Sequence, residues 1–244
     1  MRLKTGHQKI NQIRLFVICL FFGVAACDSG NIYPVDPETI KGFTIDASFR
    51  LLNMETFPDK DSYDILFGTF GDSDVPLVSK NISKPAGETV TVSLSSVPEG
   101  SCSIRLSLAR PGRQTFYTFY EMPLNGMPDI DMVIPEQVVD LISYDRVQQQ
   151  VFNQCIVCHG AADGAPAANL SLMPDDSYEN LVNVRSTMNF KNRVVPDSAE
   201  QSFLMDVLQE QAGLKYNHST SISSLKANDI VLLKEWIQTG ANNE

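Results

Sequence analysis

Histidine, cysteine and tryptophan are scarce in this sequence, and positive charge is in the minority. Its 244 residues include three His, five Cys and one Trp, and 19 Lys and Arg stand against 29 Asp and Glu. The formal net charge of −10 argues against a nucleic-acid-binding protein, because binding phosphate groups requires a basic surface. The hydrophobic and charged fractions, 43% and 20%, exclude a disordered, collagen-like or multi-span membrane protein. The length suits one large domain or two modest ones.

The apolar run near the N-terminus is too short to cross a membrane as a helix. It covers residues 15–26, twelve in all, whereas a hydrocarbon core of about 30 Å needs about 20 residues. Four basic residues and no acidic ones precede it: Arg2, Lys4, Lys9 and Arg14. This pattern predicts a signal peptide over residues 1–26.

The end of that run, Val24-Ala25-Ala26-Cys27, resembles the lipobox of bacterial lipoproteins. The resemblance implies cleavage before Cys27, lipidation of its sulfur and a tether over residues 27–39. An ordinary signal peptide and an uncleaved anchor are the alternatives. The predicted location is the bacterial cell envelope, lipid-anchored in the inner or outer membrane facing the periplasm, or at the cell surface. Cleavage would leave 15 Lys and Arg against 29 Asp and Glu, a charge of −14, which favours basic partner surfaces.

Residues 40–135 show the period-two alternation of half-buried strands. The first stretch places five apolar residues between polar ones: Phe43, Ile45, Ala47, Phe49 and Leu51. Six or seven such stretches between Pro-, Gly- and Asn-containing turns predict an all-β antiparallel sandwich, immunoglobulin-like or prealbumin-like. No His lies between positions 8 and 158, so no catalytic constellation is expected here. Cys102 falls on the apolar side of its predicted strand, which predicts a buried, unreactive thiol.

The last segment, residues 136–244, changes to a helical period and carries the sequence Cys155-Ile156-Val157-Cys158-His159. Cys-x-x-Cys-His is the attachment signature of c-type haem. Two thiols one helical turn apart can add to the two vinyl groups of one porphyrin, and the adjacent imidazole then lies under the iron. The pattern therefore predicts one covalently bound haem c.

Zinc and a redox disulfide are the alternatives for this cysteine pair. A structural zinc site needs two further ligands, and the mature chain offers only Cys102 and His218. A redox dithiol is expected in a βαβ context, whereas this pair closes an amphipathic helical pattern.

Further helices are expected after the cysteine pair. Capping-box spacing predicts helix starts near residues 177 and 199. A last helix is expected over residues 227–239, with Trp236 in the core and Gly240 at the position where a glycine ends a helix.

Residues 145–242 resemble the Planctomycete-type cytochrome c domain, within the broader class I cytochrome c fold. The resemblance rests on CIVCHG (155–160), on RVVPD (193–197) and on the terminal WI-x-x-GA (236–241). It implies an all-α, cytochrome c-like helical domain over residues 136–244.

The same resemblance assigns roles to individual residues. It implies that Cys155 and Cys158 form the thioethers and that His159 is the proximal ligand of the haem iron. It also implies that Arg193 lines the haem near a propionate, and a solvated surface arginine is the alternative.

The sixth iron ligand is where the chain departs from the family. His218 stands 18 residues before Trp236, where the family commonly has a Met-Pro pair, so we expect His218 to be the distal ligand. The alternatives are an exposed loop histidine, an open or water-bound site, or a methionine ligand: Met173, Met188 or Met205. Met/His ligation raises the reduction potential relative to bis-His, and an open position permits peroxide or gas chemistry.

These features together predict a membrane-anchored, mono-haem c-type cytochrome that acts in electron transfer and is not an enzyme. Its expected partners are the membrane, through the N-terminal lipid, and redox proteins with a basic docking surface. One alternative is a haem protein with an open iron site, acting as a peroxidase or as a gas or redox sensor. The other is a non-haem interaction lipoprotein whose cysteine pair binds zinc or forms a disulfide.

Overall fold

The computed structural model describes residues 43–58, 62–82, 89–126, 130–160, 165–209, 213, 216, 218 and 224–243. The predicted signal peptide, the lipidated Cys27 and the tether lie outside these residues. Within them, no helix combines the length and the apolar character that a membrane span requires.

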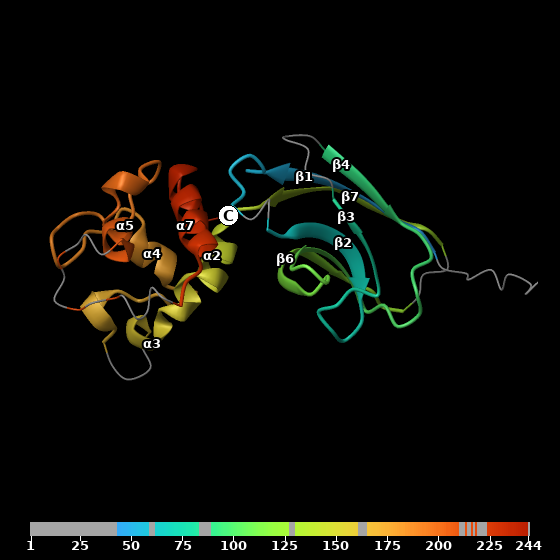
Figure 1. Cartoon of the computed structure of the whole chain (residues 1–244), viewed down its shortest axis with the longest axis horizontal. Coiled ribbons are helices and arrows are strands. Elements are labelled where there is room, and N and C mark those ends of the chain that lie inside the picture. The colour runs from blue at the N-terminus through green and yellow to red at the C-terminus, as the bar shows by residue number, and fades with distance from the viewer. Residues whose placement is uncertain are drawn as a thin grey trace, which may run out of the picture. The chain divides into compact units, whose positions relative to one another are not determined.

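In the described part of the chain, seven strands form two sheets (Figure 1). Their bounds are β1 Ile45–Leu52, β2 Asp64–Phe70, β3 Val78–Asn81, β4 Thr89–Leu94, β5 Ser103–Ala109, β6 Thr115–Pro123 and β7 Met132–Asp140. One sheet has the order β4-β1-β7 and the other the order β3-β2-β5-β6. The expected strand-forming segment therefore continues to Asp140.

The prediction of purely antiparallel, immunoglobulin-like sheets is wrong in two respects. Strand β1 pairs in parallel with β7, with Ile45 opposite Met132 and Leu52 opposite Asp140. In addition, β1 and β2 lie in different sheets, whereas the first two strands of an immunoglobulin domain share one. Alternating hydrophobicity identifies strands and their buried face, but it is the same for parallel and antiparallel neighbours, so it could not reveal the direction of pairing.

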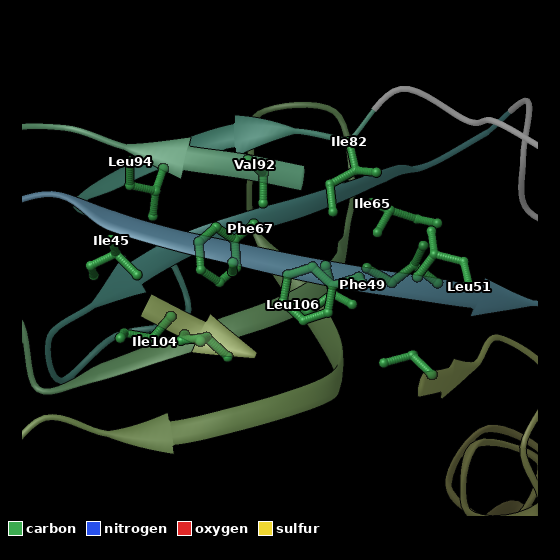
Figure 2. Packing of buried hydrophobic residues seen from close by; sticks show 14 of the residues in the cluster. Ile45, Phe49, Leu51, Ile65, Phe67, Ile82, Val92, Leu94, Ile104 and Leu106 are labelled. Atoms are coloured by element: carbon green, nitrogen blue, oxygen red, sulfur yellow. The ribbon is translucent and has the colours of Figure 1, made fainter. Parts of the chain in front are cut away.

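One hydrophobic cluster receives side chains from both sheets. Alternate residues of β1 are buried, and β2, β4, β5 and β7 add their own inward residues: Ile65, Phe67, Val92, Leu94, Ile104, Leu106, Leu108, Ile134 and Val139. Figure 2 shows this layer, with Phe49 from β1 and Leu106 from β5 among the labelled side chains. The rings of Phe49 and Phe67 meet edge to face with centroids 5.3 Å apart, which links the two sheets directly.

Cys102 is exposed, so the prediction of a buried thiol is wrong. Strand β5 begins one residue later, at Ser103. The backbone of Cys102 is held by hydrogen bonds to Phe70 and Leu124, while its Sγ lies 3.5 Å from the carbonyl oxygen of Gly100. The alternating burial of strand β5 therefore does not extend back to Cys102.

The chain after β7 consists of short helices and turns. The α-helices are α2 Tyr144–Gln150, α3 Ile156–His159, α4 Ser177–Leu181, α5 Phe203–Leu208 and α7 Ala227–Gln238, and the 3₁₀ turns are η1 Phe152–Gln154, η2 Ala167–Asn169 and η3 Ala199–Gln201. The expected helix start near 177 and the last helix are confirmed, and Gly240 follows α7 with φ of 103°. Near 199 the chain forms only a 3₁₀ turn, and α5 starts at Phe203.

The prediction of a C-terminal all-α cytochrome domain is contradicted. The protein is mixed, with about 31% strand and 25% helix, and such a domain is not seen. Two isolated β-bridges, Val182–Val194 and Arg185–Asn192, lie between the helices. Left-handed backbone at several non-glycine residues interrupts the helical pattern: Ala168, Asn169, Asn183, Phe190 and Asp197. Because few L-residues prefer this conformation, tertiary contacts must impose it, and local sequence patterns do not predict it.

A second hydrophobic cluster joins α2 to α7 and the loops between them. Trp236 is only 2% exposed, which confirms its predicted core position, and its ring centroid lies 5.1 Å from that of Tyr144 on α2. The indole Nε1 donates to the carbonyl oxygen of Asn242 at 2.8 Å, and the Tyr178 hydroxyl donates to that of Ala241 at 3.0 Å. The segment after α7 is therefore fixed to the cluster.

The start of α2 is attached to the sheets by two polar side chains. The Tyr117 hydroxyl on β6 donates to Asp145 at 2.8 Å. Arg146 is fully buried, and its guanidinium lies over the rings of Phe57 and Phe119, 5.0 and 5.8 Å from their centroids. Its Nη1 also donates to the carbonyl oxygen of Leu141 at 2.6 Å.

Candidate functional site

The predicted attachment motif forms a single helical turn. Cys155 is the N-cap of α3, and its carbonyl oxygen accepts from the backbone N–H groups of Cys158 and His159 at 3.2 and 3.0 Å. Residues three apart in a helical turn lie on the same side, so both sulfurs project from one face. Both thiols are free, with Cys155 half-buried and Cys158 exposed.

The environment of Cys155 keeps its sulfur protonated. Burial, and to a lesser degree the neighbouring Cys158, raises the pKa of the Cys155 thiol above its ordinary value. Redox-active dithiols and zinc ligands act as thiolates and depend on a lowered pKa. The Cys155 thiol is therefore a weaker acid than an ordinary cysteine.

Gly160 is required by the space beside this turn. A Cβ atom at this position would lie 2.6 Å from the carbonyl oxygen of Ile156 and 3.3 Å from the sulfur of Met173. The first of these contacts involves backbone, so no side-chain rotation relieves it. A side chain at this position would therefore require the backbone to move.

His159 is held in one tautomer by the backbone. Its Nδ1 lies 3.2 Å from the carbonyl oxygen of Leu170, and because a carbonyl only accepts, Nδ1 carries the proton. Burial lowers the pKa of His159, and hydrogen bonds to the carbonyls of Leu170 and Ala167 partly offset this. A neutral imidazole with Nδ1–H bonded to a carbonyl presents Nε2 as a metal ligand, the usual arrangement of ligating histidines.

The structure brings His218 to His159. Their ring centroids are 6.5 Å apart and their planes differ by 12°. Two imidazoles on opposite sides of one metal ion have centroids about 6.4 Å apart, because each metal–nitrogen bond is about 2.0–2.1 Å. His218 Nδ1 is buried without a hydrogen-bond partner among the described residues. The centroid spacing matches that of two imidazoles on opposite sides of one metal ion, and the two ring planes are nearly parallel.

Arg193 is buried, with 7% of its surface exposed, which does not match a solvated surface arginine. Its Nη1 donates to the carbonyl oxygen of Asn180 at 2.8 Å, and its Nη2 to those of Ala168 and Asn169 at 3.2 and 3.1 Å. Burial lowers its pKa. Within the described ranges no acidic side chain forms an ion pair with it. A buried cation without an acidic partner is suited to an anionic group.

The alternative methionine ligands lie in three different settings. Met205 is 3% exposed inside the second hydrophobic cluster. Met188 is 54% exposed and Met173 38% exposed, the latter beside Gly160. In the described part of the chain, the ring contact to His159 comes from His218.

A closed protein-only metal site is not found in the part of the chain that the structure describes. No three or more His, Cys, Asp or Glu side chains gather there in a way that could hold a metal ion. A structural zinc site needs four such ligands. Haem iron takes four ligands from the porphyrin and needs only the two axial ones from the protein, which is the number that the paired imidazoles provide.

Some residues of the site carry no sequence signal of their own. The carbonyl oxygen of Leu170 orients His159, but any residue supplies a carbonyl. Tyr216 contacts His218 with ring centroids 4.9 Å apart, and only its position two residues before His218 could have suggested this. Gly160, directly after the motif, belongs to the CIVCHG pattern on which the resemblance rests, but the pattern alone does not show the steric reason for a glycine there.

Comparison of the chain with protein families, with curated proteins and with solved structures found no match. The resemblance to the Planctomycete-type cytochrome c domain therefore stays a prediction from the motifs.

Proposed function

We propose that the protein is a membrane-anchored electron carrier that binds one haem c covalently, with His159 and His218 as the axial ligands of the iron. The observation that carries this proposal is the parallel pair of imidazoles, 6.5 Å apart. The pair joins the last residue of the CxxCH motif to a histidine 59 positions further along the sequence. A disulfide between Cys155 and Cys158 would not require this pairing, and no group of three or more His, Cys, Asp or Glu side chains that could hold a zinc ion is found in the described part of the chain.

The cysteine turn supports covalent attachment. In that reaction each thiol adds across one vinyl group: the sulfur bonds to one vinyl carbon, the thiol hydrogen goes to the other, and the carbon–carbon double bond becomes single. No oxidant is consumed. Both thiols are free, as this chemistry requires.

His159 and His218 have separate duties in the proposed site. His159 keeps its proton on Nδ1 by donating to Leu170, so Nε2 retains a lone pair for the proximal position. His218 would hold the distal position of a bound haem, and the iron would then have no open place for peroxide or a gas. Bound haem would supply an iron that alternates between Fe(III) and Fe(II) without chemical change in a substrate.

The anchor and the partners follow from sequence features. Lipid on Cys27 would hold the protein on a membrane, and the excess of 29 acidic over 19 basic residues would favour a redox partner with a basic docking surface. Contacts between redox partners are usually small and transient.

The test is the optical spectrum of the full chain, produced in a bacterial host with c-type haem maturation and extracted in detergent. We expect haem staining that persists in a denaturing gel, low-spin spectra in both oxidation states, and no change when CO is added to the reduced protein. A band without stain would refute haem attachment. A high-spin spectrum that shifts with CO would instead establish the open-site alternative.

Variants at position 218 test the distal ligand. His218→Ala should convert the iron from low spin to high spin, while His218→Met should keep it low spin and raise the reduction potential. Met188→Leu is the matched control, because Met188 is the exposed alternative ligand. A spectrum unchanged in His218→Ala and changed in Met188→Leu would transfer the ligand assignment to Met188.

A further inference from the structure

The two histidines of the proposed site are held in different ways. The His159 ring is fixed by its hydrogen bond to the carbonyl oxygen of Leu170. The buried Nδ1 of His218 has no hydrogen-bond partner among the described residues. Instead, the phenol ring of Tyr216 contacts the His218 ring edge to face, at 83° and with centroids 4.9 Å apart.

A histidine ring needs such a neighbour to keep its plane. Rotation about the Cβ–Cγ bond of histidine has broad, shallow preferences, so the side chain does not fix its own ring orientation. Ligating histidines are normally fixed by a hydrogen bond from the second ring nitrogen. Edge-to-face aromatic contacts also prefer one relative orientation of the two rings.

We propose that Tyr216 is a positioning residue that keeps the imidazole plane of His218 parallel to that of His159. The proposal rests on the function proposed above, and it concerns the orientation of the distal ligand rather than its identity. The small angle of 12° between the two imidazoles is then a consequence of the contact with Tyr216.

The relative orientation of two axial imidazoles determines the electronic structure of ferric iron. Each imidazole interacts through the π orbital perpendicular to its ring with one member of a pair of iron d orbitals. Two parallel rings act on the same d orbital and so separate the two orbitals in energy. This gives a rhombic low-spin electron paramagnetic resonance (EPR) signal. Perpendicular rings act on both members equally, and the signal becomes a strongly anisotropic low-spin line.

The experiment is EPR of the oxidised full chain and of two variants, Tyr216→Phe and Tyr216→Ala. Tyr216→Phe keeps the ring and should keep the rhombic signal of the parent protein. Tyr216→Ala removes the ring and should give the strongly anisotropic signal, or a high-spin signal if His218 leaves the iron. Haem content and the visible spectrum before oxidation, measured on each sample, show whether the site has assembled.

Two results would overturn the proposal and leave the proposed function standing. One is an unchanged rhombic signal in Tyr216→Ala, and the other is a strongly anisotropic signal already present in the parent protein. A Tyr216→Phe variant that behaves like Tyr216→Ala would also refute positioning by the ring, since only the hydroxyl differs. A parent protein without covalent haem or without a low-spin signal would instead refute the proposed function itself.

Discussion

Arg193 and His159 hydrogen-bond to consecutive carbonyl groups of one short segment. Arg193 Nη2 donates to the carbonyl oxygens of Ala168 and Asn169, and His159 Nδ1 lies 3.2 Å from that of Leu170. Ala168 and Asn169 both have positive φ, 56° and 49°, so this segment is held in a conformation that few L-residues prefer. The arginine therefore stabilises the segment whose next carbonyl, that of Leu170, is bonded to His159.

Replacing Arg193 should disturb both the stability of the protein and the proposed haem site. Arg193→Lys keeps the charge but loses the planar fork that reaches three carbonyls, and we expect the free energy of unfolding to fall by about 1–3 kcal/mol. Denaturant titration measures this change.

The matched variant Arg193→Met also removes the charge. If Arg193 neutralises a haem propionate, Arg193→Met should lower the reduction potential below that of Arg193→Lys, because a nearby positive charge disfavours Fe(III). Equal potentials in the two variants would show that the arginine has only the structural role.

The cysteines provide an internal comparison for covalent attachment. The double variant Cys155→Ser/Cys158→Ser should lose haem staining in a denaturing gel, because no sulfur remains to form a thioether. Cys102→Ser is the matched control, since Cys102 is a free, exposed thiol outside the motif, and it should retain full staining. Loss of stain in the control would mean that Cys102 also contributes to attachment.

Substitution of Gly160 should damage the turn that carries His159. In Gly160→Ala the new Cβ would lie 2.6 Å from the carbonyl oxygen of Ile156, and relieving this clash requires backbone movement. We expect a loss of about 1–3 kcal/mol in stability and a lower haem content per chain, measured by the ratio of haem absorbance to protein. Unchanged values for both would show that the turn accommodates a side chain here.

The buried hydroxyl of Tyr144 predicts a loss of stability in alkali. Burial raises the Tyr144 pKa to about 12, although its hydrogen bond with Ser177 lowers it in part, whereas an unfolded tyrosine titrates near about 10. The unfolded chain therefore releases this proton first as the pH rises. The contribution of Tyr144 is complete below about pH 10 and declines as the pH rises toward 12.

Tyr144→Phe measures that contribution. Thermal unfolding at several pH values should show a shallower decline above about pH 10 in the variant than in the parent protein. Near neutral pH the variant should lose about 1 kcal/mol, because the hydrogen bond with Ser177 is absent. Some alkaline decline should remain, since burial also raises the pKa of Tyr117. Identical slopes would contradict the assignment to Tyr144.

Sequence patterns predicted those features that depend on local periodicity or on strong motifs. The alternation in β1 identified its buried face, and the helix of Trp236 was placed to within one residue at its C-terminus. The direction of strand pairing and the all-α character of the last segment were predicted wrongly, for two reasons. The parallel pairing of β1 with β7 joins segments far apart in sequence, and the left-handed residues of the loops after α3 depend on tertiary contacts.

The candidate site also contains both features that the sequence predicts and features that it does not. The positions of Cys155, Cys158 and His159 in one turn follow from their spacing, and His218 was selected by its distance from Trp236 along the chain. The carbonyl of Leu170 and the ring of Tyr216 could not be identified from the sequence. Every residue has a backbone carbonyl, and an exposed tyrosine can have many roles. Orientation within the site is a property of packing, which a linear pattern does not encode.

The position of Arg146 has a consequence for how the protein unfolds. Its guanidinium, contributed by the first helix after the sheets, stacks on Phe57 and Phe119. A fragment that begins at residue 136 would keep Arg146 but lack Phe57 and Phe119. The guanidinium would then lose the rings that cover it, and a buried charge without its surroundings is costly. The sheets and the helical segment should therefore melt in a single cooperative transition, so that damage to the sheets would unfold the segment with the Cys155–His159 turn as well.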